Sequence, residues 1–200
     1  MVWPGHCVNA TWAALDLLVS RELDDGRSSI LKITAQGDRV VVVDGLSKPD
    51  GMVAVEGESV QGLWNDGDCL YAIEDRRGND RLMRYAWHSG QLDVLRSGLT
   101  ETEGLPRCHD GRLLYTQKGE GKVRALSDDG NDPVVVQGLR NPTFLMCDQR
   151  GLWISEDSTH RARLLLIDAQ GLRQTMLSFL KAPQAIVADG KVSPKQLTDD

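Results

Sequence analysis

The chain has 200 residues, of which 40% are hydrophobic and 26% charged, the balance of a soluble globular protein. The formal net charge is −6 at pH 7 and no basic run occurs, which argues against nucleic acid or an anionic membrane surface as the main partner. No uninterrupted apolar segment approaches the ~18 residues that a membrane-spanning helix needs, so membrane insertion is not expected.

The N-terminal residues carry no feature of a secretion signal. Residues 1–7 contain no lysine or arginine, and Asp16 interrupts the apolar stretch that follows. A cytoplasmic location is therefore expected. A secreted or periplasmic location stays open for a chain whose N-terminus has been truncated.

The first predicted strands cover residues 15–20 and 30–34, with a polar turn between them. After them, one phrase recurs four times: it opens on Gly-Leu or Phe-Leu and closes on an apolar residue seven positions after its first residue. The copies start at Gly45, Gly98, Gly138 and Phe179, so successive starts lie 53, 40 and 41 residues apart. This regularity indicates a repeat protein.

A polar turn and a short strand of bulky residues follow each of the first three copies. The turns contain Asp66-Gly67, Asp110-Gly111 and Arg150-Gly151. Asp-Gly supplies the positive φ values of a tight hairpin turn, so antiparallel hairpins are predicted. Two further strands fit before the next copy, at residues 121–126 and 133–137 in one repeat and at 163–167 and 172–178 in the next.

Each repeat is therefore predicted to be a four-stranded meander, which is the unit of a β-propeller and a poorer match to an open β-solenoid. The predicted fold is all-β: a β-propeller of four-stranded antiparallel blades, in one domain over residues 11–189. Residues 1–10 form an N-terminal segment in this scheme, and residues 190–200 form a polar tail. The unit that starts at Gly45 is about 12 residues longer than its neighbours, and Gly62 aligns with Gly104 about as well as Gly51 does, so the register there stays open.

The phrase Gly-Leu-x-x-Pro-x-Gly-apolar, followed by Asp-Gly-x-Leu-Tyr/Trp and an acidic residue, resembles the blade signature of a superfamily of six-bladed, TolB-like propellers. That superfamily includes NHL-repeat proteins, the gluconolactonase and senescence-marker-protein lactonases, strictosidine synthase relatives and, more distantly, sugar dehydrogenases that use pyrroloquinoline quinone. The resemblance covers residues 15–189. About four blades and an opening strand at 184–188 are visible, where the superfamily builds six.

An unclosed ring would expose strand edges with unpaired backbone groups, which invites self-association through the open blade edges. A smaller closed ring, or a ring completed by a second copy, are the alternatives.

In such a fold, the loops that enter each innermost strand and the loops between second and third strands open on one face, around the central channel. On this chain that face is predicted to be rich in carboxylates, which suits a hard cation such as calcium. The first loop type would contribute Lys48, Asp50, Glu101, Glu103, Asn141 and Gln184, and the second Glu74, Asp75, Lys118, Glu120, Glu156, Asp157 and His160.

The resemblance to the lactonases implies one divalent cation, held here by Glu103, Asn141 and Asp157. Glu103 begins a Glu-Gly-Leu sequence similar to the family's Glu-Gly-Pro motif, and Asn141 precedes a proline in a comparable loop. Asp157 is the last residue of a Ser-Glu-Asp sequence at the end of a second strand. The metal would polarise a lactone carbonyl and activate water, with a carboxylate of this face, Asp157, as base. The family's Asn-Gly dipeptide is absent. Solvated loop residues or turn caps are the simpler interpretation of the three residues.

Three functions are compatible with these residues. The first is a calcium-dependent lactonase-like hydrolase. The second is a non-catalytic NHL-type propeller that binds a protein or carbohydrate partner. The third is a quinone-dependent sugar dehydrogenase, for which His160 would serve as the base.

The four cysteines, Cys7, Cys69, Cys108 and Cys147, form no CxxC pair. They are predicted to be buried thiols without a disulfide framework. Large aromatic residues near the second strands are predicted to pack between blades, because aromatic side chains dominate core burial. These residues are Trp64, Tyr71, Tyr115 and Trp153.

Overall fold

The computed structural model describes residues 17–22, 28–34, 38–46, 52–54, 59–60, 62–76, 78–158 and 160–181. The predicted terminal segments and the opening strand at 184–188 lie outside these residues, as do Lys48, Asp50 and Gln184. Within the described residues there is one short helix, the 3-10 turn η1 (Lys118–Glu120). No helix in this part of the chain is long and apolar enough to cross a membrane.

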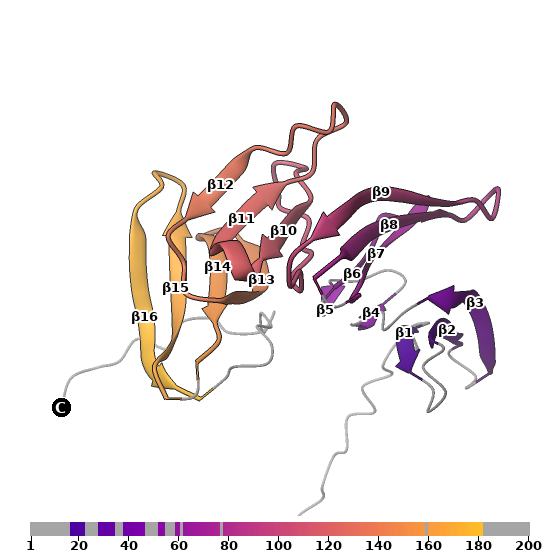
Figure 1. Ribbon diagram of the computed structural model, residues 1–200, viewed down its shortest axis with the longest axis horizontal. Helices are drawn as coiled ribbons and strands as arrows, with labels where there is room; N and C mark the ends of the chain where they lie inside the picture. Colours follow the sequence, from indigo (N-terminus) through magenta and orange to yellow (C-terminus); the bar gives the residue numbers. More distant parts are fainter. Residues whose placement is uncertain are drawn as a thin grey trace, which may run out of the picture.

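The described strands form four antiparallel sheets that follow one another in chain order, which we call blades 1 to 4 (Figure 1). Blade 1 holds β1 (Leu17–Glu22), β2 (Ser28–Ile33), β3 (Arg39–Leu46), β4 (Met52–Ala54) and β5 (Ser59–Val60). Blade 2 holds β6 (Leu63–Asn65), β7 (Cys69–Glu74), β8 (Asp80–Ala86) and β9 (Leu92–Leu99). Blade 3 holds β10 (Leu114–Gln117), β11 (Lys122–Ala125) and β12 (Val134–Gln137). Blade 4 holds β13 (Pro142–Asp148), β14 (Gly151–Glu156), β15 (Ala162–Asp168) and β16 (Arg173–Leu180).

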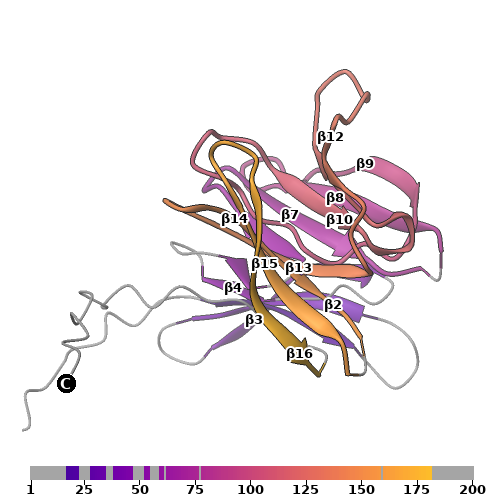
Figure 2. The same cartoon turned by 90° about the vertical axis from the view of Figure 1, so that its left-hand side faces the viewer.

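Blades 2 and 4 are four-stranded meanders in which sequence order and spatial order agree, so the predicted unit is confirmed. In blade 3, residues 104–107 take the innermost place beside β10: the amides of Leu114 and Thr116 donate to the carbonyls of Pro106 (2.9 Å) and Gly104 (3.2 Å). An isolated bridge between Arg107 and Leu113 continues this pairing. Figure 2 shows the blades from the side on which β16 lies.

Among the described residues the hydrophobic core forms three clusters, and each lies between two consecutive blades, as a propeller requires. The alternation of side chains along a strand produces this, because successive residues face opposite neighbours. In β7, Leu70 and Ala72 pack toward blade 1, whereas Ile73 packs toward blade 3. In β10, Leu114 packs toward blade 4 and Tyr115 toward blade 2. The strand faces are thus apolar on both sides, which a single blade could not bury.

The aromatic prediction is confirmed for Trp64, Tyr71 and Tyr115, which join the cluster between blades 2 and 3. Tyr115 is 2% exposed, and its hydroxyl donates to Asp132 at 2.6 Å. Trp153 is also buried, and the Arg150 guanidinium lies 4.5 Å from the centre of its ring.

The structure resolves the open register of the long Gly45 unit. The amide of Ile73 donates to the carbonyl of Gly62 (2.8 Å), as the amide of Thr116 donates to that of Gly104. Gly62 therefore corresponds to Gly104, and β6 is the innermost strand of blade 2. The surplus residues include β4 and β5; β4 pairs with β1, and β5 pairs with the other side of β4 at the edge of blade 1.

The first residue of the repeated phrase has a left-handed backbone in every copy. The φ angles are 73°, 67° and 70° at Gly45, Gly98 and Gly138, and 59° at Phe179. Glycine adopts this region freely, whereas a residue with a Cβ is strained there. Phe179 is also 83% exposed, so its side chain gains little burial in return.

Replacing Phe179 with glycine is therefore expected to raise the free energy of unfolding by about 1 kcal/mol, measured by urea denaturation. The matched control is Ser178→Gly, one residue earlier on β16, where φ is not positive. That control is expected to lower stability, because glycine there adds only backbone entropy to the unfolded chain. A Phe179→Gly protein less stable than the parent would contradict the strain argument.

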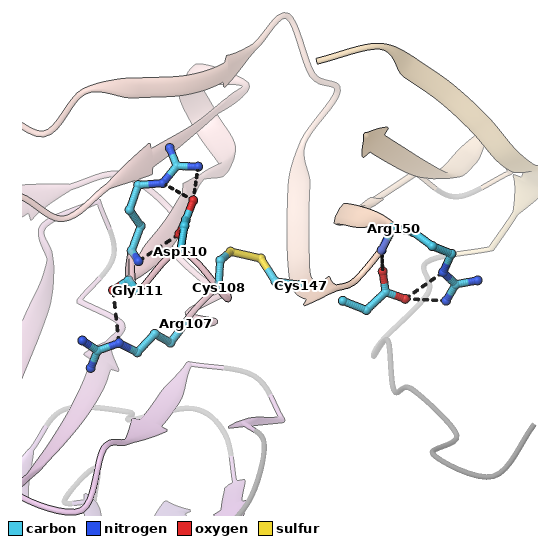
Figure 3. Close-up of a disulfide and its surroundings, with 8 residues drawn as sticks. Arg107, Cys108, Asp110, Gly111, Cys147 and Arg150 are labelled. Carbon is cyan, nitrogen blue, oxygen red and sulfur yellow. Dashed lines mark hydrogen bonds and ion pairs between the residues drawn. A yellow bond between two sulfur atoms is a disulfide. The ribbon is translucent and has the colours of Figure 1, made fainter. Parts of the chain in front are cut away.

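Two cysteines predicted to be separate thiols are joined: Cys108 and Cys147 form a disulfide with their Cα atoms 5.1 Å apart. Figure 3 shows the bond running from the turn before β10 in blade 3 to β13 in blade 4. The 39-residue separation hid the pair in the sequence, but it equals about one repeat, so the two residues occupy neighbouring places in consecutive blades. Cys69 is a free, partly buried thiol.

Candidate functional site

One side-chain pair recurs where the second strand of a blade turns into the third. An arginine seven residues further along the chain donates from Nε to the last side chain of the second strand. These pairs are Glu74 with Arg81, Gln117 with Arg124, and Glu156 with Arg163. The constant spacing of seven residues can be recognised in the sequence. It shows that the loops between the second and third strands of blades 2, 3 and 4 occupy equivalent positions.

Glu74 and Glu156, two of the carboxylates predicted for the loop face, are buried where the second strand ends: each is 1% exposed. The hydrogen bond to Glu156 raises the pKa of Arg163, so this arginine stays charged. Glu156 also accepts the amide of Arg140 at 2.8 Å. The Glu156–Arg163 pair therefore holds two loops of blade 4 against its strands. Asp157, the next residue after Glu156, is fixed in position by these contacts.

Asp157 and Glu103, two of the predicted metal ligands, do converge, and the side chain between them is Lys118. The Lys118 ammonium lies 3.0 Å from Asp157 Oδ2 and 3.3 Å from Glu103 Oε1. Burial of Lys118 opposes its charge, but the hydrogen bond to Asp157 and the nearness of Glu103 outweigh this and raise its pKa. Lys118 is a cation shared by loops of blades 3 and 4.

The lysine bears directly on the predicted calcium site. A calcium ion needs six to eight oxygen ligands at about 2.3–2.6 Å. An ion between Glu103 and Asp157 would meet the Lys118 ammonium, a like charge, in the same place. No group of three His, Cys, Asp or Glu residues suited to a metal occurs in the described ranges. As placed, these residues do not fit a calcium centre, and no catalytic step through a metal follows from them.

Asn141, the third predicted ligand, lies in the loop that enters blade 4. Its φ is 46° and its carbonyl accepts the amide of Asp157 at 2.9 Å. Glu101 has the same geometry in the loop that enters blade 3, with φ of 48° and its carbonyl 3.0 Å from the amide of Lys118. Asn141 is thus held beside Asp157 by the backbone, with an exposed side chain.

A cavity of about 370 Å³ adjoins Asn141 and Asp157. Its remaining lining comes from Arg140, Glu156, Ser158 and Arg161. The two carboxylates are already engaged, Glu156 by Arg163 and Asp157 by Lys118. Arg140 and Arg161 are exposed, and the structure shows no ion pair for either within the described residues. The cavity therefore offers two guanidinium groups to a ligand.

His160, predicted as a possible base, is exposed in the loop after Asp157. Neither its tautomer nor its hydrogen bonding is fixed by a described contact. Arg140 as a site residue and Lys118 as the partner of the carboxylates were not predicted from the sequence. A local sequence signal was available. Lys118 and Asp157 each directly follow a residue, Gln117 or Glu156, that accepts a hydrogen bond from the arginine seven positions later.

Comparison with known proteins agrees on the architecture. No protein-family model and no curated protein sequence matches the chain. Among solved structures, a TolB protein from Agrobacterium tumefaciens is similar with a TM-score of 0.61 and 14% identity, over 84% of this chain and 63% of that one. TolB from Acinetobacter baumannii gives 0.58 and 14%, over 76% and 38%.

The PQQ-bound aldose sugar dehydrogenase from Streptomyces coelicolor gives a TM-score of 0.56 and 21% identity, over 76% of this chain and 57% of that one. At these identities the likeness concerns the fold alone, which is a β-propeller. The chain spans less than two thirds of the length of each of these three structures. Activity has to be argued from the residues of the loop face, because one fold hosts many functions.

Proposed function

We propose that this propeller is a non-catalytic, NHL-type binding protein whose loop face takes a small anionic ligand, and that the ligand is a carboxylated sugar. The observation that carries the proposal is the cavity beside Asn141, with Arg140 and Arg161 in its lining and their charges uncompensated by the nearby carboxylates. A guanidinium binds a carboxylate through two parallel hydrogen bonds, which gives both affinity and orientation.

The other lining groups suit the hydroxyls of a sugar. Asn141 offers an amide donor and a carbonyl acceptor, and Ser158 offers a hydroxyl. About 370 Å³ is near the lower end of ligand pockets, which suits a single sugar ring better than a larger cofactor. The site is preformed, because the buried Glu156–Arg163 pair and the Asn141–Asp157 backbone bond fix both loops.

The same contacts support binding rather than catalysis. Asp157 Oδ2 accepts a hydrogen bond from the Lys118 ammonium, which its raised pKa keeps charged, so this oxygen belongs to an ion pair and is not directed at a ligand. The calcium-dependent lactonase remains the second candidate, because Glu103 and Asp157 approach a common point. A lactonase with calcium bound there would require the Lys118 ammonium to move out of the space between Glu103 and Asp157.

Titration with galacturonate is expected to shift the amide NMR signals of Asn141, Asp157 and Ser158, and titration with neutral galactose is not. Replacing both Arg140 and Arg161 with glutamine is expected to weaken galacturonate binding by about tenfold or more, since a hydrogen bond to a charged group contributes about 1.5–3 kcal/mol. Isothermal titration calorimetry gives the affinity.

The matched control is Arg150→Gln, an exposed arginine at the other end of β14. It is expected to leave binding unchanged, as is the removal of divalent cations with EDTA. Equal binding of galactose and galacturonate, or full binding by the double variant, would contradict the proposal. Calcium-dependent lactone hydrolysis that is lost in Glu103→Gln would support the lactonase instead.

A further inference from the structure

A second and larger cavity, of about 720 Å³, lies between blades 3 and 4 at the end opposite the loop face. The turns at its mouth lead into the ends of β10, β14 and β16 that are remote from Lys118 and Asp157. Its lining contains the Cys108–Cys147 disulfide, part of which Figure 3 shows between the two blades. The anion-binding site proposed on the loop face does not explain why this second cavity exists.

The cavity is the open end of an otherwise packed core. The cluster between blades 3 and 4 has four apolar residues that are only partly buried, namely Cys108, Val135, Cys147 and Ile167. All four line the cavity, beside the buried Leu114 and Leu152. Apolar side chains at this end of the core cluster therefore face an open cavity and are not covered by other side chains.

The walls are held in place before any ligand arrives. The disulfide links the turn that starts at Cys108 to β13, so the two blades cannot close on the space or separate freely. Preformed cavities of about 300–1,000 Å³ with apolar walls and a few polar groups are typical of small-molecule sites. A fixed cavity also spares the ligand the cost of ordering the protein.

The polar groups at the mouth are mainly acidic. Asp110, Asp148 and Asp168 line the cavity with one arginine, Arg112. Arg112 pairs with Asp110 at 2.6 Å, and Arg150, outside the lining, pairs with Asp148. Asp168 accepts the backbone amides of its own turn, from Gln170 at 3.0 Å and Leu172 at 2.8 Å, and has no cationic partner in the part of the chain that the structure describes. The apolar walls thus end at a carboxyl group with which no described cationic side chain pairs.

We propose that this cavity is a binding site for a small cationic amphiphile, whose apolar body packs against Val135, Ile167 and the disulfide and whose cationic group lies at Asp168. Each CH₂ group that leaves water adds to the affinity, so an alkyl chain that fills the cavity supplies most of it. The carboxylate selects the sign of the head group. This site is separate from the loop face, and neither proposal depends on the other.

The probe is decyltrimethylammonium, used below its micelle concentration on the oxidised full chain, with calorimetry as the readout. Saturable binding of one equivalent is expected, and decyl sulfate, with the same chain and the opposite charge, is expected to bind at least about tenfold more weakly. Asp168→Asn keeps an oxygen for the turn amides and is expected to reduce this preference.

Val135 and Val134 provide a matched pair of variants. Val135 lines the cavity, whereas Val134, its neighbour on β12, does not line it and is 41% exposed. Val135→Phe is expected to weaken binding by about tenfold or more by filling the space, and Val134→Phe to leave it unchanged. Ala169→Trp, at the exposed turn in the mouth, tests the same point without altering the core.

Three results would overturn the assignment. The first is the absence of saturable binding by the oxidised chain. The second is equal affinity for the two probes, since it would remove the role of Asp168. The third is unaltered binding by Ala169→Trp and by a folded Val135→Phe, which would place the probe elsewhere on the protein.

Discussion

Replacing Cys108 and Cys147 together with serine is expected to lower the free energy of unfolding by about 4 kcal/mol. The disulfide closes a loop of 39 residues, and the loss of chain entropy in the unfolded state grows with loop length, which gives about this value. The comparison is urea denaturation of the oxidised parent and the double variant. Reduction of the parent with dithiothreitol is expected to reproduce the loss.

The control for this prediction is Cys69→Ser, which removes the free thiol described in β7 and leaves the disulfide intact. Burial raises the pKa of Cys69, so this thiol is protonated and unreactive at neutral pH. Its replacement is expected to have little effect. A double variant as stable as the parent would show that the blades are held without the disulfide.

The disulfide also bears on where the protein works. Structural disulfides persist in oxidising compartments and are rare in the cytosol. The cytoplasmic location stays a prediction, and the Cys108–Cys147 bond favours the secreted or periplasmic alternative that the sequence left open. Mass spectrometry of the protein isolated from its source, alkylated before lysis, would show whether the bond is formed there.

The fold was predictable because two signals repeat with the blades. The phrase at Gly45, Gly98 and Gly138 marks a required left-handed backbone, and Asp-Gly turns mark the hairpins. Both are local features that a single blade needs in order to form. The long unit at Gly45 could not be registered from the sequence, because Gly51 and Gly62 fit the phrase equally well. Only pairing of β6 with β7 distinguishes them.

The site was less predictable because it depends on contacts between blades. Glu103, Asn141 and Asp157 lie in loops of blades 3 and 4, but the residue between the two carboxylates is Lys118, which lies in a third loop. Glu74 and Glu156 were predicted among the carboxylates of the loop face, since each ends a strand and precedes a polar loop. The arginine seven residues later buries each of them instead.

Replacing Asp132 with alanine is expected to lower the free energy of unfolding by about 3 kcal/mol, because it breaks a buried ion pair between blades 2 and 3. Both oxygens of Asp132 accept from Arg96 of β9, at 2.6 and 2.7 Å. Asp132 also accepts from the Tyr115 hydroxyl and from the amide of Ser127. The variant leaves the guanidinium of Arg96, whose side chain is 19% exposed, without its carboxylate partner.

The effect is expected to depend on pH. Burial alone would raise the pKa of Asp132, but the hydrogen bonds from Arg96 and Tyr115 outweigh it, so the pKa in the folded protein is lowered. A lowered pKa contributes stability above the unfolded value of about 4, and this contribution is lost as the pH falls through the folded pKa. The stability difference between parent and Asp132→Ala should therefore shrink on acidification.

Asp93→Ala is the matched control, because Asp93 pairs with Arg84 on the exposed side of the same blade, 2.8 Å apart. Exposed ion pairs contribute little, so this variant is expected to unfold nearly as the parent does. If Asp132→Ala were equally mild, blades 2 and 3 would be held by their apolar cluster alone. A large loss confined to Asp132 would instead make this charge pair the polar counterpart of the disulfide, since each fastens blade 3 to one of its two neighbours.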